Sequence, residues 1–138
     1  MFYFCTMKNC TLFTLFCLVI LFFSCTKEGQ GGNASIRGYI HASKLSSTFT
    51  QLLDQYPAKD QEVFIIYGDR TWGYDDRTNT DFQGRFSFDL LYPGNYRIYT
   101  YSRDSSRMDL SGTIAVVRDV EIGGRKEVVT VDTIHIVD

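Results

Sequence analysis

Residues 80–99 (TDFQGRFSFDLLYPGNYRIY) decide the fold of this chain. From residue 85 to residue 89, polar side chains alternate with Phe86 and Phe88, which is the period-2 pattern of a strand with one buried face. Gly84 stands just before this strand, where a tight turn needs a positive φ angle. The stretch therefore predicts a strand that is entered through a tight turn.

A second turn and a second strand follow at once. Pro93 and Gly94 take the second and third positions of residues 92–95, as in a type II turn. The next strand has two faces, one with Tyr96, Ile98 and Thr100 and the other with Arg97, Tyr99 and Tyr101. Both faces carry aromatic or apolar side chains, so the pattern leaves open which face is buried.

Other segments carry the same β signals. We expect strands at residues 34–41, 62–69, 113–122 and 127–137, with the last two joined as a hairpin around Gly123 and Gly124, and a strand or loop at residues 71–78. Residues 62–69 are apolar on both faces, which indicates a central strand. Gly38 in the middle of the first strand indicates a bulge or a close backbone approach. About seven strands at this spacing predict an all-β sandwich.

One segment departs from the β pattern. Phe49, Leu52, Leu53 and Tyr56 fall at i, i+3, i+4 and i+7, which is one apolar stripe of a helix. Pro57 follows, as is common after a helix end. This spacing predicts a short helix over residues 46–56 that closes one end of the sandwich.

The front of the chain has the features of an export signal. An apolar run at residues 11–23 (TLFTLFCLVILFF) follows Lys8 and is shorter than the roughly 20 residues that span a membrane. Residues 21–25 (LFFSC) resemble a bacterial lipobox, which implies that Cys25 carries a diacylglyceryl group and palmitate and becomes the mature N-terminus. The alternative is a membrane anchor or a buried helix at residues 11–23, with Cys25 an ordinary thiol. Met7 is a second candidate for the initiator.

This reading divides the chain into a signal peptide at residues 1–24, a lipidated N-terminus with a flexible tether at residues 25–33, and a sandwich domain at residues 34–138. All four cysteines fall at or before residue 25, so the expected mature domain has no disulfide and no zinc-thiolate site. Removal of Lys8 with the leader leaves 13 basic against 16 acidic residues, without a basic cluster. We therefore expect no nucleic-acid partner.

The motif residues resemble those of the carboxypeptidase regulatory-like and transthyretin-like (prealbumin-like) domains. The shared pattern begins at Thr80 and Asp81 and includes Gly84, Phe86, Phe88, Leu91, Pro93, Gly94 and Tyr96. The resemblance implies a seven-stranded prealbumin-like (Greek-key) β-sandwich, to which the helix at residues 46–56 would be an insertion. It also implies a non-catalytic domain, since these residues make turns and core.

Two candidate ligand sites lie just before this motif and at its first residues. Trp72 and Tyr74 can form an exposed aromatic platform for a sugar ring or a protein partner, drawing on Tyr92, Tyr99 and Tyr101 as well. Asp75, Asp76 and Asp81 lie in an acidic loop-rich segment and are weak candidates for calcium ligands, because EF-hand spacing is absent.

No catalytic signature accompanies these residues. One transthyretin-like branch is enzymatic and ends in Tyr-Arg-Gly-Ser, whereas this chain ends in residues 135–138 (HIVD). His41 and His135 can be neighbours on paired strands, but such histidines are usually surface residues. We expect no enzyme and no cofactor. The sequence predicts an outer-membrane lipoprotein, periplasmic or surface-facing, whose sandwich binds an envelope protein or, as the alternative, a glycan.

Overall fold

The computed structural model describes residues 27–106 and 112–138. These residues form nine β-strands and no helix, which confirms the predicted all-β class. The strands are β1 (Gln30–Leu45), β2 (Leu52–Pro57), β3 (Glu62–Tyr67), β4 (Asp76–Asn79), β5 (Arg85–Leu91), β6 (Gly94–Arg103), β7 (Thr113–Ile122), β8 (Val128–Thr130) and β9 (Ile134–Val137). None of the described segments is a helix long and apolar enough to cross a membrane.

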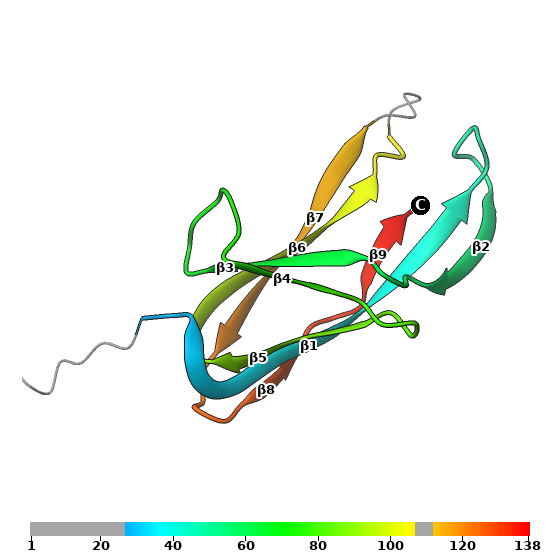
Figure 1. Ribbon diagram of the computed structural model, residues 1–138. Coiled ribbons are helices and arrows are strands. Elements are labelled where there is room, and N and C mark those ends of the chain that lie inside the picture. Colours follow the sequence, from blue (N-terminus) through cyan, green and yellow to red (C-terminus); the bar gives the residue numbers. More distant parts are fainter. Residues whose placement is uncertain (1–26, 107–111) are drawn as a thin grey trace, which may run out of the picture.

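The strands form two sheets that face each other (Figure 1). The first sheet is organised around β1, which pairs antiparallel with β5 and β2 and parallel with β8 and β9. The second sheet has the order β4-β3-β6-β7, with every pair antiparallel. The long strand β1 is therefore the central strand of the first sheet. Its N-terminal half pairs with β5 and β8, and its C-terminal half pairs with β2 and β9.

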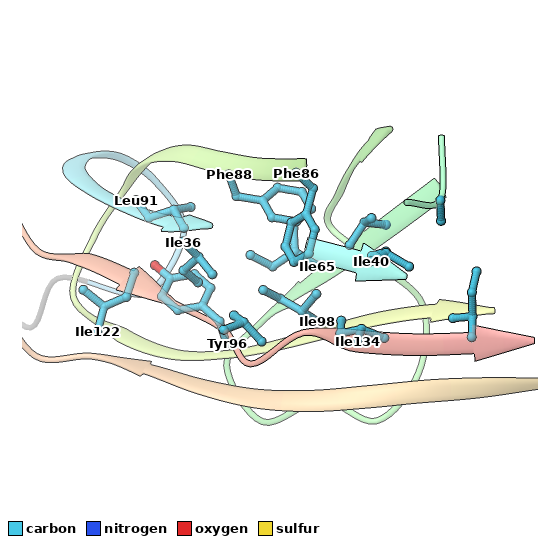
Figure 2. Close-up of a cluster of buried hydrophobic side chains, with 14 of the residues drawn as sticks. Ile36, Ile40, Ile65, Phe86, Phe88, Leu91, Tyr96, Ile98, Ile122 and Ile134 are labelled. Carbon is cyan, nitrogen blue, oxygen red and sulfur yellow. The ribbon is translucent and has the colours of Figure 1, made fainter. Parts of the chain in front are cut away.

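The core lies between the two sheets (Figure 2). Period-2 alternation places Ile36 and Ile40 of β1 and Phe86 of β5 on the inner face of the first sheet, opposite Ile65 and Ile98 of the second. All five side chains are buried. The same packing decides the face of β6 that the sequence left open, since Tyr96, Ile98 and Thr100 are the buried side chains.

The close approach at Gly38 is made by a side chain, where the sequence predicted a bulge or a close backbone approach. A Cβ atom at this position would lie 2.5 Å from the Phe86 ring, which crosses the strand in register with Gly38. Glycine therefore makes room for the buried phenyl ring.

The predicted tight turn before β5 is confirmed. Gly84 has a φ angle of 74°, and its amide donates a 2.9 Å hydrogen bond to the Asp81 carbonyl. The Asp81 carboxylate accepts hydrogen bonds from the amides of Gln83 and Arg85 at 2.8 and 3.0 Å. Thr80, the residue before Asp81, is held by a hydrogen bond that its hydroxyl donates to the Ala58 carbonyl at 2.5 Å.

The type II turn predicted at residues 92–95 is wrong. Gly94 has a φ angle of 152° and already belongs to β6, whereas the third residue of a type II turn has a φ angle of roughly 80°. The Tyr92 carbonyl accepts its hydrogen bond from the Tyr96 hydroxyl at 2.6 Å, which gives the chain another way to turn. Gly94 is required for space, because a Cβ atom there would lie 2.2 Å from Glu28.

The helix predicted at residues 46–56 is wrong as well. Residues Leu52–Pro57 form β2, which pairs with the C-terminal part of β1, and Leu52 and Leu53 remain more than half exposed. A helix this short needs an apolar surface to pack on. The extension of β1 to Leu45 instead offers an unpaired strand edge, so backbone pairing decides the conformation.

The C-terminal hairpin does not form either. After β7 the chain crosses to the first sheet, where β8 and β9 run parallel to β1. Ile134 and Ile136 are thereby buried on the inner face of that sheet. The strand count rises to nine because the predicted last strand is divided into β8 and β9 and because β2 replaces the helix.

Strand β1 begins four residues earlier than predicted. Gln30 pairs with Leu91 of β5, and the Gly29 carbonyl accepts a 2.9 Å hydrogen bond from the Tyr92 amide. A bulge between Gln30 and Ala34 takes up the extra residues. The chain is therefore fixed to the sandwich from Gly29 onward.

Candidate functional site

The outer face of the sheet β4-β3-β6-β7 carries a cluster of aromatic rings, which we call the aromatic face: Phe64, Tyr74, Tyr99 and Tyr101. The Phe64 ring stacks on Tyr99 with centroids 5.0 Å apart and an interplanar angle of 17°. Tyr74 and Tyr101 flank Phe64 at 5.1 and 5.8 Å. Phe64 is only 7% exposed, whereas Tyr74 and Tyr101 are 50% and 48% exposed. The cluster therefore has a buried centre and an accessible rim.

Strand alternation explains why these rings meet. Phe64 points outward from β3, since Val63 and Ile65 fill the core, and the register places Phe64 opposite Tyr99 of β6. The apolar pattern of residues 62–69 correctly indicated burial on both faces. On the outer face the cover is supplied by aromatic side chains.

The loop between β3 and β4 adds Tyr74 to the cluster. The Tyr99 hydroxyl donates a 3.1 Å hydrogen bond to the Gly73 carbonyl, which fixes the loop against the sheet. Burial raises the pKa of Tyr99, and the neighbouring Tyr101 raises it further, so the phenol remains a neutral donor at ordinary pH.

Charged pairs border the aromatic face. Arg77 lies opposite Phe64 on β4 and pairs with Glu62 at 2.9 Å. On the other side Arg97 pairs with Asp119 at 2.7 Å, and this hydrogen bond lowers the pKa of the Asp119 carboxyl. These planar groups present hydrogen-bond donors and acceptors beside flat apolar rings.

The structure separates the two residues of the predicted platform. Tyr74 belongs to the aromatic face, whereas the Trp72 indole makes its contact with Arg70, whose guanidinium carbon lies 5.5 Å from the ring centroid. Trp72 is 72% exposed. Tyr92, another ring considered for the platform, lies against Gly31 instead.

The three acidic candidates do not converge. Asp75 accepts a 2.7 Å hydrogen bond from the Tyr67 amide and pairs with Arg70, while Asp76 accepts from Gln30 at 2.8 Å and Asp81 serves the turn before β5. Burial pushes the pKa of Asp75 upward, but the hydrogen bonds from Tyr67 and Arg70 outweigh it and leave the pKa lowered. Within residues 27–106 and 112–138, no three His, Cys, Asp or Glu side chains gather as metal ligands.

His41 and His135 are neighbours, as expected from the sequence. They are in register on β1 and β9, and their ring centroids are 6.2 Å apart. The lipidation candidate Cys25 and the predicted signal peptide lie outside the described residues.

A groove of about 520 Å³ runs along the edge where β5 meets β4, a feature that the sequence did not indicate. Arg37, Tyr39 and Arg85 line one wall, and Thr78 and Asn79 line the other. Arg85 is paired with Asp81 at 2.8 Å, and Arg37 lies 4.0 Å from Asp89. The charges of the two arginines are thus balanced, and the groove is polar rather than cationic.

No protein-family model matches this chain, and no curated protein sequence matches it. A solved structure of a "putative carbohydrate binding protein" from Pseudomonas aeruginosa is similar with a TM-score of 0.44 and 16% identity, over 80% of this chain and 91% of that one. A solved (S)-allantoin synthase is similar with a TM-score of 0.39 and 12% identity, over 76% of this chain. This chain covers 42% of the synthase. At these levels of similarity neither function carries over.

Proposed function

We propose that this chain is a non-catalytic lipoprotein of the bacterial outer membrane, anchored through Cys25, and that its β-sandwich is a binding or assembly module. The lipobox-like residues 21–25 support the anchor. The outer surface of the sandwich supports the proposed binding role, because the described residues form a preformed apolar patch there rather than a set of convergent catalytic groups.

The half-exposed rings of Tyr74 and Tyr101 around buried Phe64 are the observation that carries this proposal. A sheet face exposed to water normally presents polar side chains. Tyrosine rings offer a flat apolar surface with few rotatable bonds, which makes them effective contact residues. The aromatic face is accordingly the proposed binding surface.

A carbohydrate is the more specific ligand that we propose for this surface. Pyranose rings expose a flat C–H face that stacks on an aromatic ring, and their hydroxyl groups need planar donors and acceptors at the rim. Arg77 with Glu62 on one side and Arg97 with Asp119 on the other provide such groups. An envelope protein that docks on the same rings is the second candidate.

The kinship with carboxypeptidase regulatory-like and transthyretin-like domains remains part of the proposal. Its support is the role of the motif residues: Gly84 makes the turn, Phe86 and Phe88 fill the core, and Tyr96 ties β6 to the start of β1.

Glycan binding tests the surface. We expect Tyr101→Ala to weaken binding to envelope polysaccharides at least about tenfold, as for a central aromatic contact. Tyr39→Ala is the matched control, since Tyr39 is 45% exposed on the other sheet and should leave binding unchanged. Equal effects of both substitutions would refute the assigned surface. Absence of glycan binding, with a photo-crosslinker at residue 101 capturing one envelope protein, would favour the second candidate.

The anchor is tested separately. Intact mass and membrane fractionation of the wild type should show a lipid-sized increase and outer-membrane association, and both should be lost in Cys25→Ala. An unmodified wild-type mass would refute the lipoprotein proposal and leave the aromatic face to be tested as a soluble binding surface.

A further inference from the structure

One end of the sandwich combines the start of the described chain with exposed apolar side chains. Glu28 and Lys27 line a groove together with Gly68 and Arg70 of the β3–β4 loop. Figure 1 shows this loop and the β5–β6 turn at the end where the N-terminal segment joins β1. Any surface that holds the N-terminus therefore faces this end of the sandwich.

The chain leaves little room between Cys25 and this end. Two residues span at most about 7 Å when fully extended. The headgroup layer of a bilayer is roughly 5–8 Å thick on each side. If the acyl chains of Cys25 begin at the lower boundary of that layer, Lys27 lies within the headgroups or just above them. The neighbouring β3–β4 loop then lies at the membrane surface.

The side chains at this end suit that position. Trp72 is 72% exposed with Arg70 over its ring, and tryptophan is enriched at the boundary between headgroups and hydrocarbon. Leu90 is 63% exposed in the strand that pairs with the start of β1, and its φ angle of 59° is uncommon for a residue other than glycine. Both side chains project apolar surface into solvent without covering the core.

Charge does not explain these features. The groove that contains Lys27 and Arg70 also contains Glu28, Asp69 and Asp75, so acidic groups outnumber basic ones there. An attraction to anionic lipids would require a basic excess. Contact with the bilayer would therefore depend on Trp72 and Leu90, and zwitterionic lipid would suffice.

We propose that Trp72 and Leu90 insert into the lipid surface that holds the Cys25 anchor, so that the sandwich is docked on the membrane by this end; this inference rests on the lipoprotein proposal above. The acyl chains hold the protein in the membrane, and the second contact fixes its orientation. Tyr101 lies seven residues beyond Gly94 along β6, or about 23 Å from the docked end, so the part of the aromatic face around Tyr101 stays open to ligand.

Trp72 is the only tryptophan of the chain, so its fluorescence reports this position alone. The full-length lipidated protein would be reconstituted into phosphatidylcholine vesicles with or without bromine near the carbonyl end of the acyl chains. We expect brominated lipid to reduce the emission about twofold or more, because the indole would lie at the depth of the bromine. Leu90→Ser should weaken this quenching, whereas membrane fractionation should stay unchanged.

The double variant Trp72→Phe/Tyr101→Trp is the matched control. It moves the only tryptophan to the aromatic face, where brominated lipid should leave the emission unchanged. A lipid-sized mass with no quenching of Trp72, or with equal quenching at both positions, would overturn the docked orientation and leave the anchor intact. An unmodified mass would overturn the anchor and the docking together. The wild-type measurement needs no substitution, so a misfolded variant would not obscure the result.

Discussion

The Tyr96 hydroxyl joins the start of β1 to the turn before β6, and its removal tests how this end of the sandwich is held together. Tyr96 is 1% exposed. Its hydroxyl donates to the Tyr92 carbonyl at 2.6 Å and accepts from the Gly29 amide at 3.1 Å. Tyr96→Phe keeps the ring and removes both hydrogen bonds, so the buried Gly29 amide and the partly buried Tyr92 carbonyl lose their partner.

The expected cost follows from those two groups. An unsatisfied buried donor or acceptor costs about 1–3 kcal/mol, so we expect Tyr96→Phe to lower the free energy of unfolding by about 2 kcal/mol. With a urea slope of about 2 kcal/mol per M, the unfolding midpoint should fall by about 1 M. The amide of Gly29 should also exchange faster with solvent, since its hydrogen bond is lost.

Tyr99→Phe is the matched control for this measurement. The Tyr99 hydroxyl donates to the Gly73 carbonyl at 3.1 Å in an exposed setting, so its removal should cost no more than about 1 kcal/mol. Urea titrations followed by far-ultraviolet circular dichroism compare the two variants. Equal destabilisation by both substitutions would refute the idea that the buried hydroxyl fixes the start of β1.

Alkaline pH provides a second measurement on the same residue. Burial raises the pKa of Tyr96 above its ordinary value of 10.0, although the Gly29 amide opposes this shift. The neutral phenol is therefore favoured in the folded state, and its contribution is complete below pH 10 and is lost as the pH rises through the folded pKa. The free energy of unfolding should fall less steeply above pH 10 in Tyr96→Phe than in the wild type. An identical pH dependence would contradict this assignment.

Three other predictions concern the strands around the motif. Gly38→Ala should lower the free energy of unfolding by about 1–3 kcal/mol because its Cβ atom meets the Phe86 ring, and Phe86→Leu should recover part of this loss in a double-mutant cycle in urea. The hydrogen bond from the Arg85 amide is the largest cause of the lowered pKa of Asp81, so the ionised carboxylate stabilises the folded state above the unfolded pKa of 3.8. This stabilisation should be lost as the pH falls below 3.8. The free energy of unfolding of Asp81→Asn should therefore decrease less steeply than that of the wild type in an acid titration. Leu90→Gly should change the unfolding free energy by less than about 1 kcal/mol or increase it, since glycine adopts the φ angle of 59° without strain; a loss beyond 2 kcal/mol would show that Leu90 packs.

Local sequence patterns predicted the elements that depend on neighbouring residues. The alternation around Phe86 and Phe88 predicted β5, and Gly84 predicted the turn before it. Both predictions succeeded because a period of two and a residue that tolerates positive φ angles can be recognised from neighbouring residues alone. The error at residues 46–56 has the opposite cause. A helical stripe of four apolar residues was outweighed by pairing with the end of β1, which is a contact that no local pattern contains.

The candidate site shows the same division. Tyr74 was recognised from its position in an aromatic loop, and the double-sided apolar pattern of β3 indicated that something covers Phe64. The identity of the cover was missed, because Phe64 and Tyr99 are brought together only by the register of β3 with β6. The acidic candidates Asp75 and Asp81 are close in sequence, yet the turn before β5 directs Asp81 to its own amides.

The sequence by itself determined the β-rich class and the strand β5 of the motif, since each follows from residue type and spacing along the chain. The tertiary structure alone decided that β8 and β9 cross to the first sheet, that Tyr96 faces inward, and that Trp72 and Tyr74 point to different surroundings. Each of these features depends on which faces of distant strands pack together, because that packing sets how much apolar surface is buried on one face rather than the other.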